Sequence, residues 1–186
     1  YAEIRSLIQM RNISIAESKL NSIRQRDAEW YYLYGTVMMA KGYIEDNDTI
    51  VVLCGDTPLV KEETLQSLFK YHLDNEYHTT VLTTRVENPT GYGRIIRDEN
   101  QDLLKIVEQK DASEEEKLVN EINSGIYCFN GKSLREALDK IDNNNAQGEY
   151  YLTDTIEIMR SNGLKVGAFD GATIEELMGV NSRVEL

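Results

Sequence analysis

The chain has 186 residues, 41% of them hydrophobic and 28% charged, which is the composition of a soluble globular protein with a substantial core. Its 20 basic and 32 acidic residues give a net charge of −12, so we expect neither nucleic acid nor an anionic membrane as a partner. No apolar run reaches transmembrane length, and no basic and apolar leader opens the sequence, which favours the cytoplasm.

The first 41 residues are predicted to be helical. Ser14 and Glu17 form a capping box for the second helix, and a third helix is expected to begin at Asp27. The stretch AESKLNSIRQRDAEWYYLYGTVMMAKG resembles part of a tetratricopeptide array, although Gly35 stands one place later than in that repeat. A plain helical hairpin is the other interpretation, and both stay open.

From residue 49 onward, strand patterns and helix patterns alternate along the chain. Strands are expected at 49–54, 78–84, 93–97, 103–108, 124–129 and 165–169. Helices are expected at 61–73, 131–141 and 153–160. The two strand patterns around DENQD read as a hairpin or as two successive strands. The alternation predicts an α/β layered sheet, largely parallel, over residues 42–186, with residues 1–41 as a separate helical segment.

One carboxylate follows the first predicted strand directly. In VVLCGDTPLV, Asp56 comes after the apolar run and before a proline. Ligands of open α/β sheets bind beyond the carboxyl ends of the strands, and a carboxylate there suits Mg²⁺. Asp56 could equally cap or turn the chain before the helix that starts near Lys61. The spacing alone leaves both interpretations open.

Other polar residues stand at the ends of predicted strands. NPTGYGRI brings Gly93 to the start of a strand, where backbone can approach a ligand or form an ordinary turn. Glu108 ends one strand and Asn123 precedes another, and each could bind sugar hydroxyls or an amide, or satisfy loop backbone. The run NNNAQGEYYLTD is either a binding loop or a long surface turn.

Together, six motifs in order make a more specific pattern. LCGDTPL, NPTGYGRI, IVEQKDA, EINSGIY, NNNAQGEYYLTD and GVNSRVEL resemble the uridyltransferase domain of the bacterial bifunctional N-acetylglucosamine-1-phosphate uridyltransferases over residues 37–186. The resemblance implies a Rossmann-like nucleotidyltransferase sheet. It also implies the synthesis of UDP-N-acetylglucosamine and pyrophosphate from UTP and N-acetylglucosamine 1-phosphate, for peptidoglycan precursors, with Mg²⁺ as cofactor.

The resemblance assigns roles to residues of the motifs. It implies Asp56 and Asn181 as magnesium ligands and no side chain as a nucleophile, because positioning and electrostatics supply the catalysis. Gly93 is implied as a backbone contact to the sugar nucleotide. The residues implied for the whole sugar pocket are Gly93, Glu108, Asn123, Tyr151 and Thr153.

The chain also departs from that family. The family's first strand and its glycine-rich loop, which holds the UTP phosphates, have no counterpart among these residues, and helical sequence stands in their place. The sheet is therefore expected to be incomplete, with the strand at 49–54 uncovered on one edge. We also expect no turnover of UTP by this chain alone. The alternative is an inactive chimera or pseudoenzyme whose helical N-terminus binds a protein partner.

Overall fold

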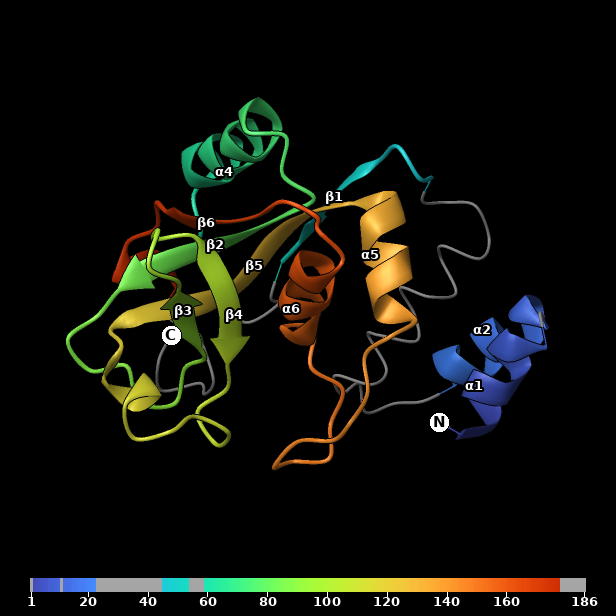
Figure 1. Cartoon of the computed structure of the whole chain (residues 1–186). Coiled ribbons are helices and arrows are strands. Elements are labelled where there is room, and N and C mark those ends of the chain that lie inside the picture. The colour runs from blue at the N-terminus through green and yellow to red at the C-terminus, as the bar shows by residue number, and fades with distance from the viewer. Residues whose placement is uncertain (1, 11, 23–44, 54–58, 178–186) are drawn as a thin grey trace.

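The computed structural model of the chain describes residues 2–10, 12–22, 45–53 and 59–177 (Figure 1). The predicted third helix falls almost wholly outside these residues, as do Asp56 and Asn181. The elements, in chain order, are α1 (Ala2–Gln9), α2 (Ile13–Asn21), β1 (Thr49–Val52), α4 (Glu62–Asp74), β2 (Thr79–Arg85), β3 (Arg94–Arg97), β4 (Leu103–Val107), the 3₁₀ helix η1 (Glu116–Leu118), β5 (Glu121–Asn130), α5 (Gly131–Leu138), α6 (Asp154–Ser161), β6 (Val166–Asp170) and α7 (Ile174–Leu177).

The described strands form one mixed sheet in the order β4-β3-β5-β2-β6, and β1 pairs with β5. Among these strands only β2 and β6 run parallel, so the prediction of a largely parallel sheet is wrong. A parallel neighbour needs a crossover connection, usually a helix. The connection between β2 and β5 instead contains the β3–β4 hairpin, and β5 therefore returns antiparallel to β2. Of the two interpretations left open around residues 98–102, the structure shows the hairpin.

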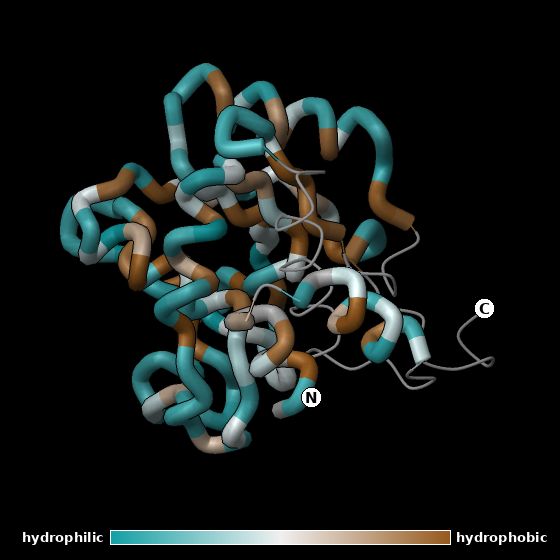
Figure 2. The backbone as a smooth tube through the Cα atoms, turned by 90° about the vertical axis from the view of Figure 1, so that its right-hand side faces the viewer, coloured by the Kyte–Doolittle hydropathy of each residue, from teal (hydrophilic) through white to brown (hydrophobic). Residues whose placement is uncertain are grey.

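Two helical layers cover the sheet, as the α/β prediction requires (Figure 1). On one face α4 and α7 bury a cluster that consists of Leu68, Leu82, Ile126, Cys128 and Leu177. On the other face α5 and α6 pack over a larger core that includes Val81, Tyr127, Phe129, Leu134, Ile156 and Met159. The apolar stretches of the tube pass through the interior, while the connecting loops are mostly hydrophilic (Figure 2). No described helix is long and apolar enough to cross a membrane.

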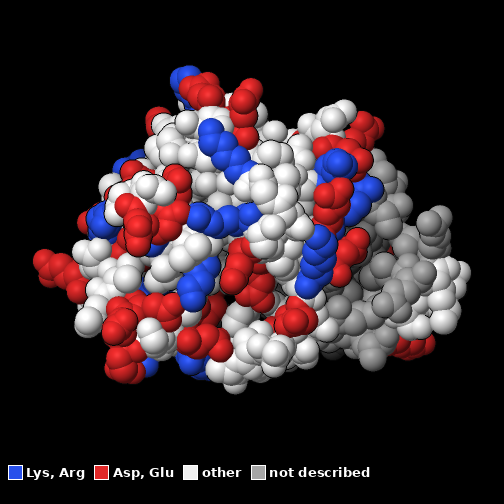
Figure 3. Space-filling model, in the orientation of Figure 1, with Lys and Arg blue, Asp and Glu red and all other residues white. Residues whose placement is uncertain are grey.

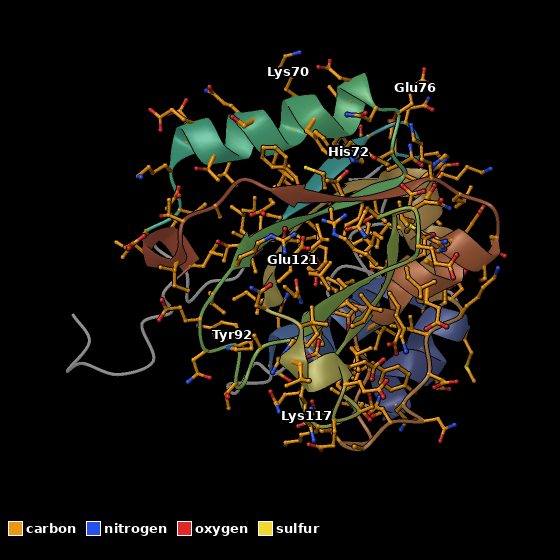
Figure 4. All side chains as sticks on the ribbon, turned by 60° about the vertical axis from the view of Figure 1, so that its left-hand side comes forward. Lys70, His72, Glu76, Tyr92, Lys117 and Glu121 are labelled. Carbon is orange, nitrogen blue, oxygen red and sulfur yellow. The ribbon has the colours of Figure 1, made fainter. Side chains whose placement is uncertain are left out.

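The helix α4 contributes one polar side chain to its buried face. His72 lies between α4 and the sheet (Figure 4), and its Nδ1 is 2.9 Å from the hydroxyl oxygen of Thr80. Burial lowers the pKa of the His72 imidazole, and the nearby His78 lowers it further. Phe69 of the same helix keeps 38% of its surface exposed, so the apolar side chains of α4 are only partly buried.

The helices α1 and α2 pack against each other and bury Ile4, Ala16 and Leu20. The described part of the predicted helical segment is therefore helical. The capping box at Ser14 is wrong, because α2 already begins at Ile13, with Asn12 at its N-cap. Ser14 consequently lies inside the first turn. The likeness to a tetratricopeptide array, and a protein partner at this segment, stay predictions.

The strand β1 pairs with β5 alone among the described strands. Val51, in the middle of β1, keeps 41% of its surface exposed. The uncovered edge stays a prediction, because residues on both sides of this strand lie outside the described ranges.

The strand β5 begins at a buried carboxylate, Glu121, which is 2% exposed and lies within the sheet (Figure 4). Arg97 donates to it from Nη2 (2.6 Å) and Nε (2.9 Å), Arg85 from Nη2 (3.0 Å), and Thr83 from its hydroxyl (2.9 Å). Burial alone raises the pKa of the Glu121 carboxyl, but these donors and charges outweigh it and leave the pKa below its ordinary value. The carboxylate thus joins β5 to β2 and β3.

We expect the substitution Glu121→Ala to lower the free energy of unfolding by about 3 kcal/mol, because it leaves the Arg97 guanidinium in the sheet without its carboxylate. Urea unfolding at pH 7 measures the change. Glu114→Ala is the matched control, since Glu114 pairs with Lys117 on the surface and is 92% exposed. That control should leave the urea midpoint unchanged, because an exposed ion pair is screened by solvent. Equal effects of both substitutions would contradict the role given to Glu121.

Candidate functional site

Four of the five predicted sugar-pocket residues meet at one end of the β3–β5 region. Gly93 directly precedes β3, Glu108 follows β4, Asn123 lies in β5, and Thr153 precedes α6. The backbone N–H of Asn123 donates to the carbonyl of Gly93 (2.9 Å), and the hydroxyl of Thr153 donates to Oε1 of Glu108 (3.3 Å). These contacts bring four separate segments of the chain into one group, which we call the polar group.

Gly93 forms the closely packed floor of this group. A Cβ atom at Gly93 would lie 3.3 Å from Oε1 of Glu108, 3.3 Å from Cγ2 of Ile106 and 3.4 Å from Cβ of Asn123. Any side chain at this position would therefore press on the residues predicted to hold the sugar. Glycine therefore fits this position without displacing these neighbours, and the backbone contact to a sugar nucleotide stays a prediction.

A β-bulge orients the side chain of Asn123. The register between β2 and β5 shifts between Val81 and Thr83, and Gly125 has a positive φ of 78° that favours glycine. Oδ1 of Asn123 accepts from the Gly125 N–H (2.9 Å) and from the Tyr127 hydroxyl (2.9 Å). Because a backbone N–H requires an oxygen, the amide orientation is set. Its Nδ2 has no acceptor among the described residues.

Glu108 supplies the acceptor of the polar group. It is half-buried, and burial raises the pKa of its carboxyl. The hydrogen bond from Thr153 lowers that pKa and the charge of Asp111 raises it again. Glu108 therefore takes up a proton at a higher pH than an ordinary glutamate does. As a carboxylate it can accept hydrogen bonds from hydroxyl or amide groups.

Tyr151 lies beside the polar group, in the loop between α5 and α6. Its hydroxyl donates to Oδ2 of Asp111 (3.2 Å) and accepts from Nε2 of Gln147 (2.7 Å). Asp111 also accepts from the backbone N–H of Ala146 (2.8 Å) through Oδ1. The loop thus folds back onto the residues that follow Glu108. The direct sugar contact assigned to Tyr151 stays a prediction, since its hydroxyl is engaged within the loop.

The surroundings of the polar group are acidic. Burial raises the pKa of Asp154, at the start of α6, to about 6, and the charges of Asp142, Glu157, Glu108 and Asp111 add to this effect. Acidic side chains gather on the lower part of the face shown in Figure 3, where these loops lie. No Lys or Arg side chain donates to Gly93, Glu108, Asn123 or Thr153 in the part of the chain that the structure describes. The arrangement suits an uncharged polar ligand better than a phosphate.

The predicted magnesium ligands are not tested, because Asp56 and Asn181 both lie outside the described residues. Within the described ranges, no group of three or more His, Cys, Asp and Glu side chains could hold a metal ion. The magnesium site therefore stays a prediction.

Sequence reasoning missed three residues that support the polar group. They are Gln109, Asp111 and Tyr127, and each belongs to a motif in which only a neighbouring residue drew attention. The position of Gln109 and Asp111, just after a predicted strand end, is the signal that could have identified them. Tyr127 carries no such signal, because it lies inside an apolar strand pattern.

A protein-family model described as nucleotidyl transferase matches residues 9–174. The chain belongs to the nucleotidyl transferase family. The match confirms the family predicted from the six motifs. It begins inside the predicted helical segment, and the boundary between residues 1–41 and 42–186 stays a prediction.

Relatives within this family are close in sequence over part of their length. The bifunctional protein GlmU of Clostridioides difficile (strain 630) is 79% identical over 150 residues, which cover 81% of this chain and 33% of that protein. The bifunctional protein GlmU of Alkaliphilus metalliredigens (strain QYMF) is 55% identical over 150 residues, with the same coverage. The chain spans about a third of the length of these curated relatives.

A solved structure of apo UDP-glucose pyrophosphorylase has the same fold. The TM-score is 0.58 at 15% sequence identity, and the match covers 83% of this chain and 58% of the other. At this identity the likeness shows the fold alone. It confirms the α/β fold with an open sheet that was predicted for the nucleotidyl transferase part.

We expect the substitution Asp154→Asn to raise the free energy of unfolding at pH 7.5 by about 1 kcal/mol, since the partly exposed carboxylate is screened by solvent. The pKa of Asp154 in the folded state, about 6, exceeds its ordinary value of 3.8. Stability therefore falls as the pH rises through this range, and the penalty is complete above it. Urea unfolding at pH 7.5 and near pH 4 should show a gain that disappears at the lower pH. An equal gain at both pH values would contradict this explanation.

Proposed function

We propose that the polar group binds the N-acetylglucosamine part of a sugar nucleotide. The proposed reaction forms UDP-N-acetylglucosamine and pyrophosphate from UTP and N-acetylglucosamine 1-phosphate. Family membership and the identity to GlmU proteins support this reaction. UTP is a cytoplasmic metabolite, so we place the activity in the cytoplasm.

The observation that carries the proposal is the convergence of complementary, mostly uncharged hydrogen-bonding groups. Asn123 offers Nδ2 as a donor, and the backbone of Gly93 lies directly against the carboxylate of Glu108. Glu108 offers acceptor oxygens, and Thr153 offers a hydroxyl. A sugar with an N-acetyl substituent presents hydroxyl donors and an amide that match such a set. An acidic site of this kind holds the sugar rather than the phosphates.

The charge on the phosphates needs a different source of compensation. Asp56 and Asn181 are the residues that we propose as ligands of Mg²⁺, which when bound neutralises phosphate oxygens. Nucleotidyl transfer needs reactants held in line more than it needs a protein nucleophile. The contribution of the described residues is therefore to bind and orient the sugar.

The experiment that tests the proposal is calorimetric titration of the chain with UDP-N-acetylglucosamine, with and without Mg²⁺, at pH 7.5. We expect binding by the unaltered chain. Glu108→Gln should bind about tenfold more weakly, because an NH2 donor replaces one of the two carboxylate oxygens that accept from the sugar. Glu115→Gln, on the exposed surface, is the matched control and should bind as the unaltered chain does.

The pH dependence gives a second readout. Because the pKa of Glu108 is raised, its carboxylate is lost at a pH above the range usual for glutamate. The affinity of the unaltered chain should therefore fall as the pH is lowered toward 5, and the advantage over Glu108→Gln should shrink. Absence of binding by the unaltered chain at millimolar ligand would refute the proposed function.

A further inference from the structure

An almost fully buried arginine directly follows the glycine at the floor of the polar group. Arg94 is 1% exposed. Its Nη1 donates to the carbonyl oxygen of Tyr92, and its Nη2 donates to Oε1 of Gln109 (2.7 Å). Its Nε is buried and has no partner within the described ranges. Figure 4 shows Tyr92 in the loop that leads into β3.

The partners of this guanidinium are neutral. No ion pair of Arg94 with a carboxylate occurs in the described part of the chain, in contrast to Arg97 three residues later, which pairs with Glu121. Burial lowers the pKa of Arg94, and no acidic neighbour counters that effect. A buried cation without a counter-charge costs stability relative to an apolar side chain of similar volume. Stability is therefore a poor explanation for Arg94.

Gln109 connects the arginine to the preceding turn. Its Oε1 accepts from Nη2 of Arg94 and also from the backbone N–H of Gly91 (3.0 Å). Gln109 follows Glu108 in the sequence. One short segment therefore contains both the side chain that binds the Gly91 turn and the carboxylate proposed to accept hydrogen bonds from the sugar. We call the side chains of Arg94 and Gln109, with their bonds to Gly91 and Tyr92, the Arg94–Gln109 clamp.

The clamp determines the direction of one backbone donor. The Tyr92 carbonyl and the Gly93 N–H belong to a single peptide group, and the described chain has no cis peptide bonds. In a trans peptide these two bonds point in opposite directions. Because Arg94 holds the carbonyl, the Gly93 N–H points away from the guanidinium. That N–H has no acceptor among the described residues.

We infer that Arg94 is a positioning residue, which through the Tyr92 carbonyl orients the Gly93 N–H toward the bound sugar. This inference rests on the proposed function of the polar group. A donor held in the bound orientation before the ligand arrives avoids the cost of ordering the loop on binding. Arginine is required because its planar fork reaches the carbonyl and Gln109 at once, whereas the single ammonium of lysine reaches one of them.

The test compares stability with affinity in the full chain. We expect Arg94→Met to leave the urea midpoint unchanged or raise it, while the Kd for UDP-N-acetylglucosamine increases about tenfold, the loss of roughly one hydrogen bond. Arg94→Lys should not restore the affinity.

Arg160→Met is the matched control. Arg160 is partly buried, pairs with Asp98 (2.6 Å) and donates to the carbonyl of Leu103, at the opposite end of β4 from Glu108. Its loss should lower stability and leave the Kd unchanged. The two arginines should therefore show opposite patterns. A lower midpoint with unchanged Kd for Arg94→Met would show that Arg94 only stabilises the fold, and would overturn the inference.

An NMR measurement on the chain without any ligand tests the clamp separately from the proposed function. The clamp predicts that Arg94→Met shifts the ¹H–¹⁵N resonance of Gly93, whereas Arg160→Met leaves it in place. If the unaltered chain binds no sugar nucleotide, the proposed function fails, and the inferred role of Arg94 toward the sugar fails with it. If it binds but the Gly93 resonance is the same in Arg94→Met, the clamp alone is refuted.

Discussion

The site depends on the ion pairs and hydrogen bonds of the Glu121 carboxylate, which lies at the start of the central strand β5. It accepts hydrogen bonds from β2 and β3 side chains in a place almost without solvent. Such a group is tolerated only when its donors are in position, so β2, β3 and β5 must come together in one register. That register places Asn123 next to the backbone of Gly93. The polar group is thus a consequence of how the sheet forms around one buried charge.

The polar group suits one of the two chemical requirements of the proposed reaction, orientation of the sugar, and not the other, compensation of the phosphate charge. Gly93, Asn123 and Thr153 provide uncharged hydrogen-bonding groups, and carboxylates surround them, which is unfavourable for a bare phosphate. In the proposed reaction the phosphates therefore need positive charge from elsewhere, and the sugar end needs orientation. The bulge at Gly125 and the Arg94–Gln109 clamp serve orientation, since each directs one donor of the pocket. The bulge interrupts the regular register of β2 and β5, and the clamp contains a buried arginine whose desolvation costs stability.

Much of the fold could be predicted from the sequence. Apolar periodicity located every described strand and most described helices of the α/β part, and the β3–β4 hairpin was one of the two interpretations left open at DENQD. Strand direction could not be read from that periodicity, because a buried antiparallel strand and a buried parallel strand share the same apolar pattern. The length of β5 was underestimated because the polar residues Glu121, Asn123 and Ser124 interrupt the apolar pattern at its start. Gly93, Glu108, Asn123 and Thr153 were identified through motifs, and the structure brings all four together.

The sequence by itself determined the family and the α/β class, and it proposed the residues of the polar group, because short motifs with polar residues at strand ends are local features of the chain. Only the tertiary structure decided how those residues act together. The shared acceptor oxygen of Gln109, the fixed amide of Asn123 and the burial of the Arg94 guanidinium, which has no carboxylate partner among the described residues, all depend on tertiary contacts. Such contacts follow from sheet register and burial, which no local pattern encodes.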